Sequence, residues 1–241
     1  MELKICHLYP DVLNLYGDRG NIICMKRRLE WRGIDCTVTP LGLGSAETLA
    51  GFDLVFIGGG QDFEQEVLLP DLQRGRAAEV RAAVADGVTF LAICGGYQML
   101  GNYYETHTGE KCDFIGAVNF HTVGAPERMI GNYFFNCTPD CGGSGVVAFE
   151  NHSGRTFLGH GVQPLGHVTR GFGNNGTDGT EGVRWQNVFG SYGHGSLLPK
   201  NPALADFILQ TALERKYGQC DLAPLDDSME LAAHYEISKR L

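Results

Sequence analysis

The sequence predicts an α/β protein built on a doubly wound, mostly parallel sheet. Two observations indicate this class. Strand-like and helix-like segments alternate through the first hundred residues, which is the order that a parallel sheet with helices on both faces requires. The strand-like runs are also apolar almost without interruption, as expected for strands that are buried on both faces.

Each element of this first half has its own local signal. Ile22, Met25 and Leu29 recur at helical spacing and Gly33 follows as a stop signal, so residues 21–31 are expected to form a helix. A second, longer helix is expected over residues 71–85, closed by Gly87. The expected strands are residues 3–8, 36–39, 54–57 and 88–93.

The second half has a different texture. From about residue 112 glycine is frequent and the apolar runs are short, which favours antiparallel strands. We expect one α/β domain over residues 1–217, in which the β-rich second half extends the sheet. Residues 218–241 are expected to form a tail with a short helix. The expected later elements are strands at 129–137, 146–149 and 183–189 and a helix at 202–217.

Composition excludes several classes of protein. The formal net charge is −9 and the pI is near 5.3, which argues against a nucleic-acid binder. The amino-terminal residues lack a signal-peptide pattern, and no run approaches the roughly 18 apolar residues of a membrane span. We therefore expect a cytoplasmic protein whose eight cysteines are mostly reduced.

A cysteine at the end of a buried strand is the main chemical signal. Residues 90–101 read FLAICGGYQMLG, so the strand ends at Cys94 and two glycines follow. This pattern predicts a nucleophile elbow, in which Gly95 and Gly96 avoid clashes on the tight turn. The amino end of a following helix favours a thiolate, which is the attacking form of cysteine. The alternative is a small buried residue in a tight turn.

Two other glycine-rich segments support the catalytic interpretation. Residues 57–65, IGGGQDFEQ, follow an apolar strand and could direct backbone N–H groups toward an oxyanion. Residues 189–197, FGSYGHGSL, place His194 in a glycine frame after another strand, where it could act as the base for Cys94. Either segment alone could be a simple turn.

Together these residues carry a family resemblance. The chain resembles the class I (triad) glutamine amidotransferases, which have a flavodoxin-like fold, and in particular the cobyric-acid-synthase-like branch. Within that branch it is similar to the glutaminase subunits of lipid II isoglutaminyl synthases. The resemblance runs from residue 7 to about residue 217. Five segments carry it: CGGYQMLG, GSYGHG, HLYPDVLNLYGDRGNI, GGGQDFEQ and RMIGNY.

The resemblance implies a mechanism. Cys94 would attack the side-chain amide of glutamine, and His194 would act as general acid and base through a glutamyl thioester. The oxyanion would be held by backbone N–H groups of the glycine loop, from Gly59 and Gly60, and by that of Gly95. Ammonia would then leave for an acceptor site elsewhere.

The resemblance also assigns two substrate-binding residues. Gln98, four residues after the nucleophile, matches a position that helps to hold the substrate glutamine. Arg128, in ERMIGNY, matches a substrate-binding position, and a guanidinium suits the α-carboxylate of a free amino acid. A surface arginine at a strand start is the alternative for Arg128.

One position departs from the family pattern. Many triad amidotransferases carry a glutamate two residues after the catalytic histidine, whereas this chain has Ser196. Either an acid elsewhere in this chain orients His194, or an aspartate comes from a partner. The resemblance implies the latter: a MurT-like ligase subunit in a heterodimer, without which the isolated chain would be a poor glutaminase.

The resemblance places the acceptor chemistry outside this chain. The ligase subunit would use ATP and Mg²⁺ to amidate the D-glutamate α-carboxyl of lipid II, a step in peptidoglycan synthesis. This chain shows no G-x-x-x-x-G-K-[ST] phosphate loop, and the resemblance implies neither a cofactor nor a metal in it.

Several alternatives stay open. The acceptor could be a cobyrinate, although such amidotransferases are usually fused to their synthetase domain. A cysteine hydrolase of similar fold would not need Gln98 and Arg128, and an inactive scaffold would not need Cys94 and His194. A zinc-binding module could use Cys112, Cys137 and Cys141, but their spacing lacks a paired C-x-x-C signature.

The polar residues of the opening loop have two interpretations. Asp11, Asn14 and Asp18 lie among apolar anchors in YPDVLNLYGDRGN. They could face the site or a partner, or the loop could be purely structural.

Overall fold

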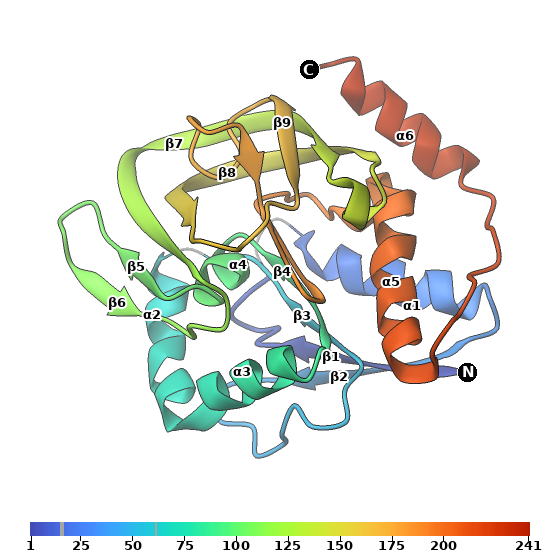
Figure 1. Cartoon of the computed structure of the whole chain (residues 1–241), viewed down its shortest axis with the longest axis horizontal. Coiled ribbons are helices and arrows are strands. Elements are labelled where there is room, and N and C mark those ends of the chain that lie inside the picture. The colour runs from blue at the N-terminus through green and yellow to red at the C-terminus, as the bar shows by residue number, and fades with distance from the viewer. Residues whose placement is uncertain (15–16, 61) are drawn as a thin grey trace.

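The computed structural model describes residues 1–14, 17–60 and 62–241. Leu15 and Tyr16 of one family motif and Gln61 of another lie outside the described residues. Over these described residues the chain forms two six-stranded sheets that pack against each other, with helices around the first (Figure 1).

The first sheet confirms the predicted doubly wound architecture. Its order is β11-β12-β4-β3-β1-β2, and every pairing is parallel except that of β11 with β12. All residues of β3 and β4 are buried, as the uninterrupted apolar runs predict. The strands are β1 (Glu2–Leu8), β2 (Asp35–Leu41), β3 (Leu54–Ile57), β4 (Thr89–Ile93), β11 (Val183–Trp185) and β12 (Val188–Ser191).

Helices cover this sheet on both sides. In Figure 1, α1 and α5 lie on one side of it and α3 on the other. The long helix expected over residues 71–85 is interrupted, because Gly75 has a φ of 136°, which no helix interior adopts. The segments are α1 (Arg19–Glu30), α2 (Asp62–Asp71), a π-helical turn (Leu72–Arg76), α3 (Ala77–Ala85), α4 (Gly95–Met99), a 3₁₀ turn (Leu198–Lys200), α5 (Pro202–Tyr217) and α6 (Ser228–Ser238).

The second sheet differs from the sequence-based expectation. Only β11 and β12 extend the first sheet; the other strands form a separate one, in the order β10-β9-β7-β5-β6 with β8 paired to β7. Its central hairpin is also far longer than predicted. The strands are β5 (Tyr103–Glu105), β6 (Lys111–Asp113), β7 (Phe120–Cys137), β8 (Gly145–Leu158), β9 (Gly166–Arg170) and β10 (Thr180–Glu181), with a 3₁₀ turn (Pro139–Cys141) between β7 and β8.

Burial explains why this hairpin stands apart. Along β8 buried residues alternate with more exposed ones, so the strand has one face in the core and one toward solvent. The first sheet is instead covered on both faces. The register of β7 against β8 shifts between Gly124 and Met129, so β7 continues past an irregularity that interrupts its sequence pattern.

The tail is tied back to the body through a few polar contacts. Arg28, almost fully buried on α1, pairs with Asp206 of α5 and with Asp227 at the start of α6. His234 of α6 contacts the carbonyl of Lys200 at 3.0 Å. The helix α6 therefore lies against the turn that follows the candidate base.

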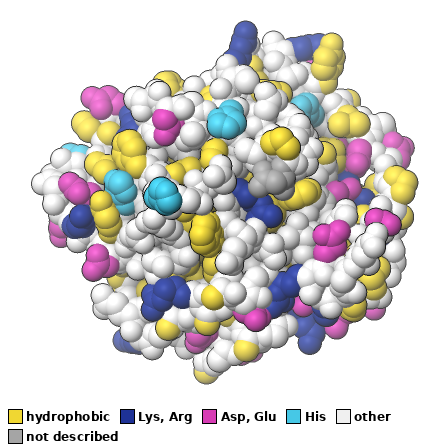
Figure 2. All heavy atoms as spheres, viewed as in Figure 1, with side chains coloured by type: hydrophobic (Ala, Val, Ile, Leu, Met, Phe, Trp, Pro, Cys, Tyr) yellow, Lys and Arg dark blue, Asp and Glu magenta, His cyan; other side chains and the backbone are white. Residues whose placement is uncertain are grey.

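The surface carries charges of both signs. On the face shown in Figure 2, basic and acidic side chains are interspersed. Within the described ranges, no helix is both long enough and apolar enough to span a bilayer.

Candidate functional site

The nucleophile elbow expected from the sequence is present. Cys94 directly follows β4 and precedes α4, with φ 47° and ψ −107°, a conformation that is rare for residues other than glycine. A Cβ on Gly96 would lie 2.6 Å from the carbonyl oxygen of Gly58, so the glycine permits this close approach. The Cys94 side chain is 6% exposed. The chain therefore holds one thiol in a strained, supported turn.

The structure brings His194 to Cys94. Parallel pairing sets Ser191 of β12 opposite Ile93 of β4, and the Cys94 N–H donates to the Ser191 carbonyl at 2.8 Å. His194 follows three residues later, where its N–H donates to the carbonyl of Phe149 in β8 at 2.8 Å. The two side chains lie close enough to interact, because Cys94 raises the pKa of His194. Residues one hundred positions apart thus form a thiol–imidazole pair.

Asp18, at the start of α1, completes a triad-like arrangement. Its carboxylate oxygens lie 3.4 and 3.3 Å from His194 Nδ1, and both side chains are fully buried. Burial would lower the pKa of His194, but the Cys94 charge and the hydrogen bond to Asp18 outweigh burial and raise that pKa. The site therefore favours the imidazolium form of His194.

This arrangement bears on the two sources proposed for the orienting acid. In the structure an aspartate of this chain contacts the imidazole, and the aspartate from a partner that the resemblance implies stays a prediction. Ser196 stands where many triad amidotransferases carry a glutamate. Its hydroxyl donates to the Gly17 carbonyl at 2.7 Å. The family motif that contains Asp18 was the sequence signal that could have identified this acid. A residue just before a helix is also typical of a structural cap, so the signal was ambiguous.

The predicted oxyanion hole needs one correction. The Gly59 N–H donates to Asp18 Oδ2 at 2.8 Å, so in this structure it is committed to positioning the acid. A Cβ on Gly59 would also lie 2.5 Å from the His194 ring, so only glycine fits there. Gly95 is the first residue of α4, where a helix leaves its N–H groups without intrahelical partners. Gly60 and Gly95 remain the predicted donors.

Gln98 lies in the interior beside the site. It is 4% exposed on α4, and its Nε2 donates to the Tyr192 hydroxyl at 3.0 Å. That hydroxyl also contacts the Thr156 hydroxyl at 2.6 Å. In this state Gln98 holds the segment that leads to His194, and its predicted contact with substrate stays a prediction.

Arg128 is exposed on β7, beside the strand that holds His194. Its guanidinium donates to the side-chain oxygen and to the carbonyl of Asn151, both at 2.9 Å. Asn151 lies two residues after Phe149, whose carbonyl accepts the His194 N–H. Arg128 is therefore anchored on the second sheet with an exposed cation, as a carboxylate-binding role requires.

Sequence reasoning missed a buried carboxylate behind the base. Glu181 Oε1 accepts hydrogen bonds from the Tyr133 hydroxyl at 2.9 Å, the Ser191 hydroxyl at 2.7 Å and the Tyr192 N–H at 2.9 Å. Burial, opposed by these hydrogen bonds, raises its pKa to about 7. Its two-residue strand between glycines gave no sequence signal. Glu181 connects the second sheet to the segment carrying His194.

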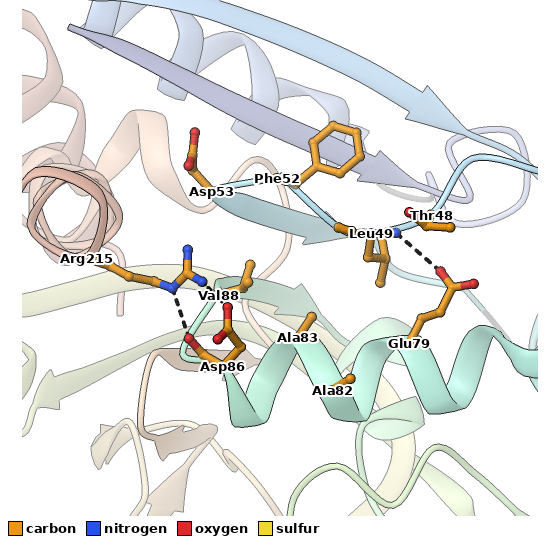
Figure 3. A pocket seen from close by; sticks show the side chains of 12 residues that line it. Thr48, Leu49, Phe52, Asp53, Glu79, Ala82, Ala83, Asp86, Val88 and Arg215 are labelled. Carbon is orange, nitrogen blue, oxygen red and sulfur yellow. Dashed lines mark hydrogen bonds and ion pairs between the residues drawn. The ribbon is translucent and has the colours of Figure 1, made fainter.

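A separate cavity of about 450 Å³ lies at the other end of the first sheet (Figure 3). Phe52 and Val88, which line it, precede β3 and β4, whereas Cys94 follows β4. Arg215 at its edge is paired with Asp86.

Within the described part of the chain, no three metal-binding side chains gather as a metal site, so the zinc alternative gains no support.

The chain is similar to known glutamine amidotransferases. Residues 4–202 match the CobB/CobQ-like glutamine amidotransferase domain. The chain is 39% identical over 232 residues to the Staphylococcus aureus protein named lipid II isoglutaminyl synthase (glutamine-hydrolyzing) subunit GatD, covering 96% of this chain and 93% of that protein. The Streptococcus pneumoniae protein of the same name is 40% identical over 243 residues, covering 97% and 90%.

Solved structures support the fold. The structure of PurLQS from Thermotoga maritima superposes with a TM-score of 0.59 at 17% identity, covering 89% of this chain and 99% of that chain. The Trypanosoma brucei CTPS glutaminase domain with bound acivicin gives a TM-score of 0.56 at 11% identity, covering 91% and 98%. With a cysteine elbow, an adjacent histidine and the matching domain, the chain belongs to the CobB/CobQ-like glutamine amidotransferase family.

Proposed function

We propose that this protein is the glutamine-hydrolysing subunit of a lipid II isoglutaminyl synthase. The observation that carries the proposal is the contact of Cys94 with His194, itself contacted by Asp18, in a chain 39% and 40% identical to two subunits of that name. The reaction would convert L-glutamine and water into glutamate and ammonia.

The geometry suits a two-step amide hydrolysis. In the first step the Cys94 sulfur bonds to the side-chain carbonyl carbon, and backbone N–H groups at Gly60 and Gly95 stabilise the oxyanion. Protonated His194 gives its proton to the departing nitrogen, which leaves as ammonia. A glutamyl thioester on Cys94 remains.

The second step uses the same groups in reverse. Neutral His194 takes a proton from water, and the hydroxide that forms adds to the thioester carbonyl. The carbon–sulfur bond then breaks, which releases glutamate and restores the Cys94 thiolate. Asp18 holds the imidazole and stabilises its charged form in both steps.

We place substrate recognition on the second sheet. Arg128 would bind the α-carboxylate of glutamine, because its guanidinium is exposed and fixed by Asn151. Gln98 would contact the substrate amide after exchanging its bond with Tyr192. A substrate held by both sheets would keep its amide over Cys94.

The larger proposed role requires a partner. Ammonia would pass to a MurT-like ligase subunit in a heterodimer, which would use ATP and Mg²⁺ to amidate the D-glutamate α-carboxyl of lipid II. The proposed location is the cytoplasm, and the proposed process is peptidoglycan synthesis.

A cobyrinate acceptor is the second candidate, and the comparisons favour it less. A probable cobyric acid synthase of Methanothermobacter thermautotrophicus is 29% identical, covering 81% of this chain but 40% of that protein. The identity to the GatD proteins is higher and extends over at least 90% of their length.

The first experiment is glutamate release from L-glutamine by the purified chain, alone and with a co-expressed MurT-like partner. Because Asp18 already contacts His194, we expect measurable release by the chain alone and faster release in the complex. His194→Asn should abolish release in both preparations.

The contrary outcomes separate the parts of the proposal. Release only in the complex would return the orienting acid to the partner. No release in either preparation would contradict glutamine hydrolysis. A complex that hydrolyses glutamine but amidates cobyrinate rather than lipid II would favour the second candidate.

A further inference from the structure

Ser196 occupies the position where many triad amidotransferases carry a glutamate, yet it does not face the imidazole. Its hydroxyl donates to the carbonyl of Gly17 at 2.7 Å, directly before Asp18. Ser196 has a φ of 51°, an unusual value for a residue with a side chain, so its surroundings must hold it in this conformation. The side chain reaches from the loop of the base to the loop of the acid.

The close approach of these loops is built into neighbouring residues. A Cβ on Gly20 would collide with the Ser196 hydroxyl, so the first turn of α1 must be bare where Ser196 packs. The buried Asn21 accepts a hydrogen bond from the Leu198 N–H at 2.9 Å through its side-chain oxygen. Two hydrogen bonds therefore join Gly17 and the first turn of α1 to the segment after His194.

The turn itself is fixed from its other side. Lys200 Nζ donates to the carbonyls of His194, Gly195 and Ser196 at 3.3, 2.5 and 3.3 Å. Three carbonyls held by one ammonium group leave this turn little freedom. The position of the Ser196 hydroxyl is thereby defined relative to His194.

These contacts bear on the distance between the Asp18 carboxylate and the His194 imidazole. The Asp18 carboxylate lies 3.3 to 3.4 Å from His194 Nδ1, longer than the roughly 2.8 Å of a charge-assisted hydrogen bond. The Gly59 N–H fixes one carboxylate oxygen of Asp18 at 2.8 Å, and the Ser196 hydroxyl fixes the backbone directly before Asp18.

We propose that Ser196 is a positioning residue that holds Asp18 against the His194 imidazole. The residue takes the place of the family's glutamate by anchoring a different acid instead of supplying one. The inference deepens the proposed function and rests on it. Ser196 itself touches neither the imidazole nor the substrate in this assignment.

The test is the titration of His194 in Ser196→Ala and Ser196→Gly. His194 is followed by NMR of its imidazole, assigned with His194→Asn. Since Asp18 contributes to raising the His194 pKa, withdrawal of its carboxylate should lower that pKa in both variants, toward the value in Asp18→Asn. The charged or titratable groups around His194 are Cys94, Asp18, His152 and Lys200.

Activity gives a second readout. Loss of one hydrogen bond should lower kcat about 3- to 10-fold with little change in KM. Ser196→Ala in the Asp18→Asn background should cause no further loss, because the residue acts through Asp18. Ser238→Ala, which removes an exposed hydroxyl on α6, is the matched control and should change neither readout.

Three results would overturn the inference. An unchanged His194 pKa in both Ser196 variants would show that the hydroxyl does not position the acid. If Ser196→Gly keeps the wild-type His194 pKa and kcat while Ser196→Ala lowers both, the effect comes from backbone conformation and not from the hydroxyl. Additive losses with Asp18→Asn would contradict action through Asp18. Because the titration needs no glutamine, it stands even if the wild type proves not to be a glutaminase.

Discussion

The two sheets build the site in different ways. In the first, β4 consists of five buried residues, and the turn after it sets Cys94 in place through contiguous residues. In the second, the Phe149 carbonyl of β8 accepts a hydrogen bond from the His194 N–H. Glu181 of β10 accepts one from the Ser191 hydroxyl, in the segment just before His194. The first sheet carries both reacting residues, since Cys94 follows β4 and His194 follows β12, whereas the second sheet aligns His194 through contacts that are distant in the sequence.

This difference separates two kinds of effect. A change at the elbow removes a reacting atom, so it should abolish turnover at every pH. A change in the contacts around His194 leaves all reacting atoms present and should alter pH dependence, substrate affinity or stability. The following experiments test that division.

The largest effect is expected at the elbow. Cys94→Ser replaces the thiol with a far weaker nucleophile and should reduce glutamate release roughly 10⁴-fold or more. The assay is steady-state glutamate formation, with Cys36→Ser on β2 as a control that should stay active. Substantial release by Cys94→Ser would move the chemistry away from the elbow.

Asp18→Asn should have the next largest effect. Loss of the carboxylate should lower kcat on the order of 10²-fold, and the His194 pKa should fall. The alkaline limit of the kcat profile should therefore move to lower pH. An unchanged profile would show that the contact between Asp18 and His194 has no catalytic role.

The same pair has a predictable effect on stability. The folded-state pKa of His194 is raised from 6.5 to about 10, so the charged imidazole stabilises the fold. That contribution is fully present below pH 6.5 and is lost as the pH rises toward 10. In thermal denaturation, the melting temperature of wild type should therefore exceed that of Asp18→Asn at low pH, and the difference should shrink across this window.

Arg128→Ala tests the second sheet as the substrate-binding side. Loss of a charge-assisted hydrogen bond to the α-carboxylate should raise KM for glutamine about 10-fold or more with a smaller change in kcat. Arg170→Ala removes another exposed arginine of the same sheet and should leave KM unchanged. Equal effects of both variants would assign Arg128 to general surface charge.

The smallest effect on catalysis is expected from Glu181→Gln, whose signature is thermodynamic. Burial raises the Glu181 pKa from 4.5 to about 7, so its charged form costs stability in the folded state. Wild type should lose stability relative to the variant as the pH rises from 4.5 to 7, by roughly 3 kcal/mol in total.

Thermal denaturation at pH 5 and pH 8 measures this difference. Glu236→Gln on the exposed face of α6 serves as the control and should follow the wild type at both values. If wild type and Glu181→Gln change in parallel with pH, then Glu181 does not ionise inside the second sheet. The buried link between that sheet and His194 would then need another explanation.

Much of the first sheet could be predicted because its signals are local. Apolar runs, helical spacing and glycine stops identified four of its six strands, β1 to β4, and the helix α1. The second sheet was not recognised as separate. The irregularity between Gly124 and Met129 and the exposed residues around Arg128 interrupt the pattern of β7, so one strand of 18 residues resembled a shorter one.

By itself the sequence determined the elbow, the thiol on it and the histidine in a glycine frame, because backbone conformation at a turn depends on adjacent residues. Only the tertiary structure decided that Asp18 is the acid beside His194, that Gly59 serves this acid, and that Ser196 points toward Gly17. Asp18 and His194 are separated by 176 positions. Their contact depends on how α1 and the two sheets pack, and no pattern of neighbouring residues specifies it.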